Sequence, residues 1–103
     1  MDKVIRDGKV AVLYSPGYGA GWYSWHNIKE LLFDPVVVYM IETKVARYEV
    51  ENYCREKYGE ESYLGGAENL KIMWLDIGTN FIIKEYDGSE SIQLKEAIDW
   101  HVA

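Results

Sequence analysis

The sequence is short of cysteine and of positive charge, and both shortages narrow what the protein can be. Its single cysteine, Cys54, excludes an internal disulfide and a cysteine-only metal cluster. Only 11 lysines and arginines stand against 17 acidic residues, which gives a formal net charge of -6. This balance argues against binding along a nucleic acid backbone, because that affinity comes from cations at phosphates. It still permits a single nucleotide held by one or two local cations, or an acidic surface docked on a basic groove of a partner.

Long apolar runs are missing as well. No stretch approaches the length of a membrane span. The start, Met1-Asp2-Lys3, runs directly into a predicted strand, with no apolar segment typical of a signal peptide. We therefore expect a soluble protein of the cytoplasm that has no contact with a membrane.

The length fits one domain, spanning residues 1–103, with a modest core. Domains of this size often gain stability by association. The sequence also has nine tyrosines and four tryptophans, residues that are typical of contact surfaces. These features predict a homo-oligomer.

Two Asp-Gly pairs between apolar runs predict β-hairpins, because both residues of such a turn tolerate a positive φ. The first is Asp7-Gly8, followed by a strand over residues 9–14 that is apolar on both faces and should be central. The second is Asp87-Gly88, between strands over residues 80–86 and 89–94. A further strand is predicted over residues 70–76.

Helices are predicted between these hairpins. Asp34-Pro35 has the pattern of an N-cap and a first helical residue. The β-branched run from Val36 to Ile41 also suits a strand, but Val37, Ile41 and Val45 have helical spacing, so we expect a helix. Residues 46–58 form the clearest amphipathic helix, closed by Gly59, with Cys54 on its buried face as a core thiol. A shorter helix around Ile28, Leu31 and Leu32 would be capped by Ser24 or Asn27, and residues 95–103 fit either a helix or an extended tail. The expected class is α+β: an antiparallel sheet built from the N-terminal and C-terminal hairpins, with two to three helices packed on one face.

The segment from Ser15 to His26, rich in glycine, tyrosine and tryptophan, is the main candidate for recognition. It lies between a strand and a helix, where backbone N–H groups can hold an anion and aromatic rings can stack on a base. The glycine spacing differs from the dinucleotide fingerprint, and the lysine of a P-loop is absent. We expect one of the aromatic rings to be buried and the others to be presented. With a cation for phosphate and an amide for a base edge or ribose, the predicted ligand-binding residues are Gly17, Tyr18, Gly19, Gly21, Trp22, Trp25, Arg47 and Asn80.

Catalytic and metal sites find little support. His26 and Glu30 have helical spacing for a metal, but no third ligand is evident. Ser15 or Ser24 with His26 and Asp34 has the composition of a nucleophile triad, but no nucleophile elbow is present. We therefore predict that the protein is not an enzyme and that it uses neither a cofactor nor a metal.

The segment Ser15-Pro16-Gly17-Tyr18-Gly19-Ala20-Gly21-Trp22, preceded by Lys9-Val10-Ala11-Val12-Leu13, resembles small proteins encoded by tailed phages and prophages. The resemblance continues through Leu32-Phe33-Asp34-Pro35, Tyr63-Leu64-Gly65-Gly66-Ala67 and residues 85–91. It implies a counter-defence role in the host cytoplasm, by one of two routes. The protein would sequester a nucleotide-like signalling molecule, or it would inhibit a host defence protein, as anti-CRISPR proteins do, with Glu49, Glu51 and Glu56 facing a basic groove. A small hydrolase is the third alternative.

Overall fold

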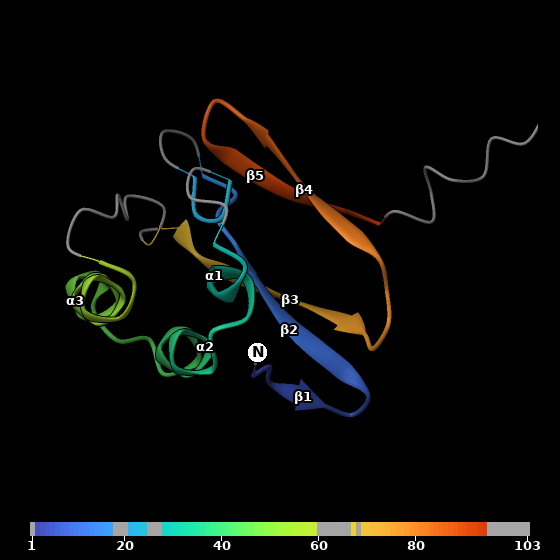
Figure 1. Ribbon diagram of the computed structural model, residues 1–103, viewed down its shortest axis with the longest axis horizontal. Coiled ribbons are helices and arrows are strands. Elements are labelled where there is room, and N and C mark those ends of the chain that lie inside the picture. The colour runs from blue at the N-terminus through green and yellow to red at the C-terminus, as the bar shows by residue number, and fades with distance from the viewer. Residues whose placement is uncertain (1, 18–20, 25–27, 60–66, 68, 95–103) are drawn as a thin grey trace, which may run out of the picture.

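Strand β2 (Lys9–Tyr14) lies at the centre of the computed structural model, with other elements packed against both of its faces (Figure 1). The structure describes residues 2–17, 21–24, 28–59, 67 and 69–94. The predicted α+β class is confirmed, with antiparallel strands from both ends of the chain and helices between them. The other elements are β1 (Ile5–Arg6), α1 (Glu30–Phe33), α2 (Pro35–Glu42), α3 (Arg47–Tyr58), β3 (Lys71–Asp76), β4 (Phe81–Tyr86) and β5 (Ser89–Leu94).

The strands fall into two antiparallel sheets, with the orders β1-β2-β3 and β4-β5. Both predicted hairpin turns are present, and Asp7, Gly8, Asp87 and Gly88 all have a positive φ between 51° and 83°. In the first sheet β2 is the middle strand, as its two apolar faces predict, with Val12 opposite Met73 of β3. In the second sheet Ile83 lies opposite Ile92.

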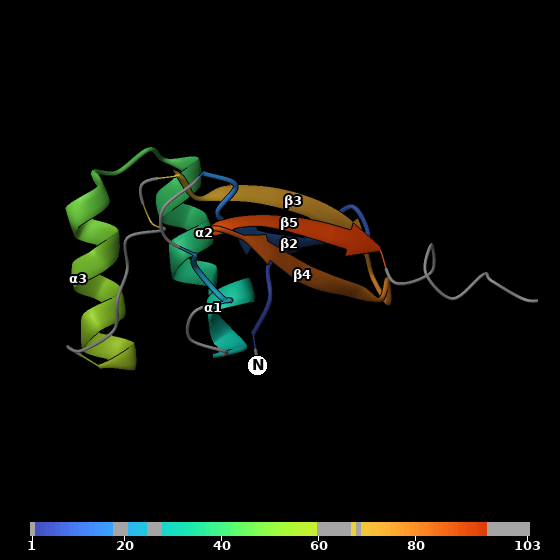
Figure 2. The same cartoon turned by 90° about the horizontal axis from the view of Figure 1, so that it is seen from above.

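The two faces of β2 contact different layers. Ala11 and Leu13 belong to a cluster with buried residues of α2 and α3, whereas Val12 packs with Phe81, Ile83 and Ile92 of the second sheet. Figures 1 and 2 show the helices on one side of the first sheet and the β4-β5 hairpin on the other. Helix α1 contributes to both layers, because Leu31 enters the first cluster and Leu32 and Phe33 enter the second.

The start of α2 and the end of α3 lie where local sequence signals place them, whereas α2 ends at Glu42 and does not reach Val45. Asp34 caps α2 by accepting hydrogen bonds from the N–H groups of Val36 and Val37, and Gly59 follows α3 with a φ of 116°. Cys54 is fully buried, as predicted. The predicted cap of α1 by Ser24 is wrong, because Lys29 occupies the N-cap position and makes no side-chain cap bond. The alternative cap Asn27, and the segment 95–103, lie outside the described residues.

No helix among the described residues is both long and apolar enough to cross a membrane.

Candidate functional site

Glu90 of β5 holds the loop that follows β2. Its side chain is only 1% exposed. One carboxylate oxygen accepts a hydrogen bond from the Ser15 N–H at 2.9 Å, and the other accepts from the N–H groups of Trp22 and Ser24 at 2.9 and 2.8 Å. The Ser24 hydroxyl donates to the second oxygen at 2.7 Å. A buried carboxylate is tolerated when it is hydrogen-bonded in this way, so Glu90 is a structural clamp for the loop.

The clamp changes what the loop can bind. Backbone N–H groups after a strand are the atoms that the sequence suggested for an anion, and three of them already donate to Glu90. The backbone of β5 adds to the attachment, because the Glu90 N–H donates to the Ser15 carbonyl at 2.7 Å and the Ser89 hydroxyl donates to the Pro16 carbonyl at 2.6 Å. At these three N–H groups, the chain's own carboxylate takes the place that a ligand phosphate would have.

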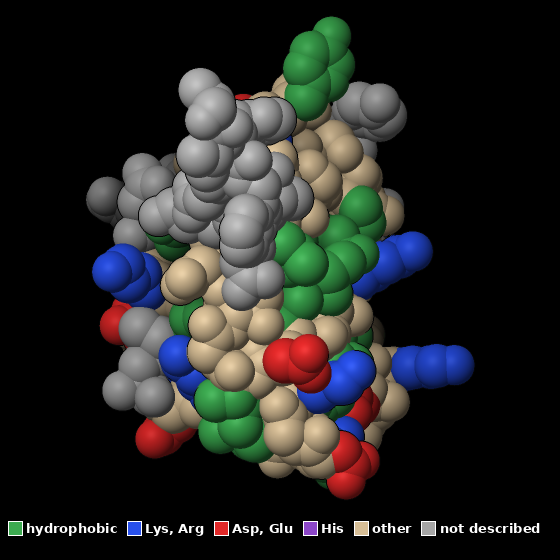
Figure 3. Space-filling view, turned by 90° about the vertical axis from the view of Figure 1, so that its right-hand side faces the viewer, with side chains coloured by type: hydrophobic (Ala, Val, Ile, Leu, Met, Phe, Trp, Pro, Cys, Tyr) green, Lys and Arg blue, Asp and Glu red, His purple; other side chains and the backbone are tan. Residues whose placement is uncertain are grey.

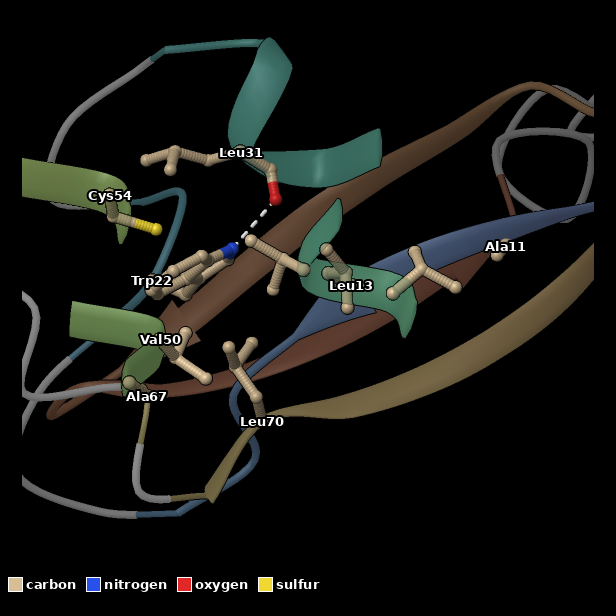
Figure 4. Packing of buried hydrophobic residues seen from close by; sticks show 10 residues of the cluster. Ala11, Leu13, Trp22, Leu31, Val50, Cys54, Ala67 and Leu70 are labelled. Atoms are coloured by element: carbon tan, nitrogen blue, oxygen red, sulfur yellow. Dashed lines mark hydrogen bonds between the residues drawn. The ribbon is translucent and has the colours of Figure 1, made fainter. Parts of the chain in front are cut away.

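Trp22 is a core residue. Its side chain is 0% exposed, and its indole Nε1 donates to the Leu31 carbonyl at 2.6 Å (Figure 4). It packs in the same cluster as Leu13, Val50 and Cys54. The assignment of Trp22 to a ligand-stacking surface is therefore wrong, because no face of the ring is open. Trp22 is the buried ring that the short loop was expected to contain.

The glycines of the loop also have packing roles where they are described. A Cβ on Gly17 would lie 2.2 Å from the Asn69 amide nitrogen and 2.9 Å from the Asn69 Cβ, so Gly17 is needed for close packing. Gly21 is buried beside Trp22. The other predicted members of this site, Tyr18, Gly19 and Trp25, lie outside the described residues.

The two remaining predicted ligand residues lie on other elements. Arg47 is exposed on α3, and its Nε donates to Glu51 at 2.6 Å. Asn80 is exposed just before β4, where it lines a hollow of about 160 Å³ together with Phe33 and Phe81.

Asp34 is the second buried carboxylate, 2% exposed, and it joins α2 to α3. Besides capping α2, it accepts hydrogen bonds from the hydroxyls of Tyr53 and Tyr58 at 2.9 and 2.6 Å and from Lys57 Nζ at 3.0 Å. Burial acts to raise the pKa of Asp34, but these hydrogen bonds outweigh it and the pKa lies below the ordinary 3.8. Burial, with Asp34 adding to the effect, raises the pKa of the Cys54 thiol to about 12, so this thiol is not a nucleophile at neutral pH.

These contacts separate the residues of the suggested triad. The Asp34 carboxylate is committed to α3, and the Ser24 hydroxyl donates to Glu90. The Ser15 hydroxyl is buried with no hydrogen-bond partner among the described residues. The described part of the chain also contains no group of three histidine, cysteine or acidic side chains placed to hold a metal. His26 lies outside it.

An open apolar groove of about 440 Å³ lies between α1 and β4. It is lined by Tyr23, by Lys29 just before α1, by Leu32 and Phe33, and by residues 81–83 of β4, and we name it the α1–β4 groove. Phe33 and Phe81 meet edge to face with their centroids 6.2 Å apart. In Figure 3, which shows the molecule from the right-hand side of Figure 1, hydrophobic side chains gather on this face with both basic and acidic side chains around them.

Cations lie close to this groove although the chain is acidic overall. Lys29 is part of its wall, and Lys3 Nζ lies 4.5 Å from the centre of the Phe33 ring. The adjoining 160 Å³ hollow, which shares Phe33 and Phe81, is lined by Lys3 and by one acidic residue, Asp76. An apolar floor with cationic edges suits a ligand that is apolar and carries negative charge.

The Asp34 cluster makes stability sensitive to acid. Because the pKa of Asp34 is lower in the folded chain than the ordinary 3.8, its contribution is present above about pH 3.8 and is lost as the pH falls through the folded value. We expect Asp34→Asn to destabilise the protein by about 1–3 kcal/mol at pH 7, and to lose less stability than the parent between pH 7 and pH 3. Urea denaturation at both pH values measures this. Asp76→Asn, an exposed carboxylate on β3, is the matched control, and equal acid sensitivity of the parent and Asp34→Asn would contradict the assignment.

The fold and the site define a small α+β protein whose buried carboxylates hold its loop and helices in place, with an apolar groove open at its surface. Comparisons with protein-family models, curated proteins and solved structures give no match to this chain.

The sequence interpretation missed Glu90 as a site-organising residue. A signal was present, because Glu90 lies on the same strand face as Ile92 and Leu94. An acidic residue on an otherwise apolar strand face indicates a buried carboxylate that needs donors. What the strand pattern does not contain is the identity of those donors, which lie 66 to 75 residues earlier in the chain.

Proposed function

We propose that this protein is a non-enzymatic binding protein that takes up an apolar, acidic segment of a partner protein in the α1–β4 groove. The observation that carries the proposal is the groove itself, about 440 Å³ in volume, with an apolar floor and Lys29 at its wall. Interfaces of this kind have an apolar core that provides affinity and a polar rim that provides orientation.

Of the two ligand classes that the sequence left open, a partner protein has the better support. The nucleotide alternative relied on the N–H groups of the loop and on its aromatic rings, with Arg47 and Asn80 as further contacts. Three of the N–H groups donate to Glu90 and Trp22 is buried, whereas Tyr18, Gly19 and Trp25 lie outside the described residues. Sequestration of a nucleotide-like signal therefore stays a prediction without a described site. A role in phage counter-defence, host-cell localisation and homo-oligomerisation likewise stay predictions, the first two from the resemblance.

The acidic face of α3 has less support as the docking surface than the groove has. Glu51 forms ion pairs with Arg47 and Arg55, at 2.6 and 3.5 Å, so its charge is balanced on its own helix. Glu49 and Glu56 remain exposed, but exposed acidic residues on a helix are ordinary solvated groups.

A matched pair of variants tests the groove. The probe is an acetylated, amidated eight-residue peptide in which valine alternates with glutamate. We expect it to bind the parent, and we expect Ile82→Glu to weaken binding at least about tenfold, because a carboxylate would replace apolar floor and repel the peptide. Ile77→Glu makes the same change at an exposed isoleucine outside the groove and should leave binding unaltered.

Isothermal titration calorimetry measures the affinities, and circular dichroism checks that each variant is folded. Equal affinity of the parent and Ile82→Glu would contradict the groove as the binding surface. A panel of mononucleotides and cyclic dinucleotides provides the comparison, and binding of one of these with no peptide binding would favour the nucleotide alternative.

A further inference from the structure

The outer edge of β4 has no strand beside it among the described residues, since β4 pairs only with β5. In an antiparallel hairpin, successive residues of a strand direct their backbone N–H and C=O groups alternately toward the partner strand and away from it. The Glu90 N–H donates to the Ser15 carbonyl, so the backbone of Glu90 faces away from β4. Its register partner Glu85 must then face away from β5.

The direction of the backbone N–H and C=O groups repeats at every second residue along β4. Ile83 and Phe81, like Glu85, direct their backbone groups to the outer edge. None of the three has a backbone hydrogen bond on that side within the described part of the chain. Such an edge is a template for another strand.

The α1–β4 groove opens onto this edge. Three consecutive residues, Phe81, Ile82 and Ile83, line it. Neighbouring side chains of a strand point to opposite faces, so a cavity that contacts three in succession lies beside the strand and not above one face of it. The wall opposite is formed by Tyr23, Leu32 and Phe33. A segment lying in the groove therefore runs alongside unpaired backbone groups.

We infer that the partner segment enters the groove as an extended strand that pairs with the outer edge of β4. This inference rests on the function proposed above and specifies how the groove would be used. Main-chain hydrogen bonds to Phe81, Ile83 and Glu85 supply affinity, and alternate side chains supply specificity. A two-stranded sheet is marginal by itself, so a third strand would also stabilise the hairpin.

The charges around the edge define the chemistry of the added strand. Lys84 is exposed on the outward face of β4, Lys29 lines the groove, and Lys3 lies over Phe33. The exposed carboxylate at the edge, Glu85, accepts a hydrogen bond from the Gly88 N–H at 2.6 Å. The strand that fits has apolar side chains toward Leu32 and Phe33 and carboxylates on its outward face, on the side of Lys84. Lys29 and Lys3 add positive charge beside the apolar wall. The β4 strand of a second copy would bring another Lys84 to the same edge, so we assign the edge to an acidic segment of a partner.

Backbone methylation of the peptide separates strand pairing from simple groove binding without altering the protein. In the valine–glutamate peptide, valine amides point to one edge and glutamate amides to the other. Two peptides are compared, one N-methylated at two central valines and one at two central glutamates. We expect one of them to bind at least about tenfold more weakly than the unmethylated peptide, because its methyl groups face β4, and the other to bind within about threefold. A third peptide with lysine in place of glutamate should bind more weakly than the parent peptide.

The calorimetric titrations distinguish the failure of strand pairing from the failure of groove binding. If both methylated peptides bind like the unmethylated one, while Ile82→Glu still abolishes binding, strand pairing is overturned and groove binding stands. If no peptide binds, both strand pairing and the proposed function are overturned. Sedimentation equilibrium without peptide tests whether a second copy of the chain occupies the edge of β4. A dimer that is abolished by Ile82→Glu would overturn the assignment to a partner segment.

Discussion

Replacing Glu90 with alanine is expected to destabilise the protein by roughly 3–5 kcal/mol, a large part of the stability of a domain of this size. The substitution would leave the N–H groups of Ser15, Trp22 and Ser24, and the Ser24 hydroxyl, without their acceptor. A buried donor without an acceptor costs about 1–3 kcal/mol, and several would be exposed to this cost together. Urea denaturation followed by circular dichroism measures the change.

Glu90→Gln and Glu49→Ala sharpen this test. Glutamine keeps one acceptor oxygen and the side-chain volume, so it should cost clearly less than alanine. Glu49 is exposed on α3, and Glu49→Ala should change the free energy of unfolding by less than about 0.5 kcal/mol. If Glu90→Ala were as stable as Glu49→Ala, the clamp would not hold the loop.

Trp22→Ala is expected to cost about 3–5 kcal/mol through the cavity that it creates, with or without any ligand. The side chain is fully buried between β2 and α3, and its Nε1–H bond to the Leu31 carbonyl would also be lost. A domain of about 100 residues loses 4–8 °C in Tm for each kcal/mol, so Trp22→Ala should unfold at a much lower temperature than the parent.

Two phenylalanine substitutions refine this test, a milder change at Trp22 and a control at Trp74. Trp22→Phe keeps an aromatic ring but leaves the Leu31 carbonyl without its donor. Its Tm should therefore lie between the Tm of Trp22→Ala and that of the parent. Trp74→Phe on β3, where the ring is half-buried beneath Arg6, should cost less than about 1 kcal/mol. A Trp22→Ala variant with the Tm of the parent would contradict the core assignment and restore Trp22 as a candidate for ligand binding.

The local elements of this fold could be predicted because their signals are short-range. The Asp-Gly turns specify both hairpins through positive φ, and Asp34-Pro35 specifies the start of α2 through its cap. The apolar character of both faces of β2 predicts its central position, and the structure confirms it. Each of these inferences needs only neighbouring residues and the periodicity of the element.

The arrangement of the candidate site could not be predicted, because it depends on contacts across the chain. Trp22 is placed in the core by Leu31, Val50 and Leu13, and nothing in its immediate neighbours distinguishes a buried ring from a presented one. Asp34 could be identified as a cap, but its bonds to Tyr53 and Tyr58 require α3 to pack against α2. The α1–β4 groove exists only because the second sheet packs on the far face of β2, which no local pattern specifies.

The most direct test of the proposed function is a titration of ¹⁵N-labelled protein with the valine–glutamate peptide, followed by amide chemical shifts. Binding in the α1–β4 groove predicts that the largest shifts occur at Tyr23, Leu32, Phe33 and residues 81–85, with little change on α3. Shifts confined to α3, or no shifts at peptide concentrations in the millimolar range, would contradict it.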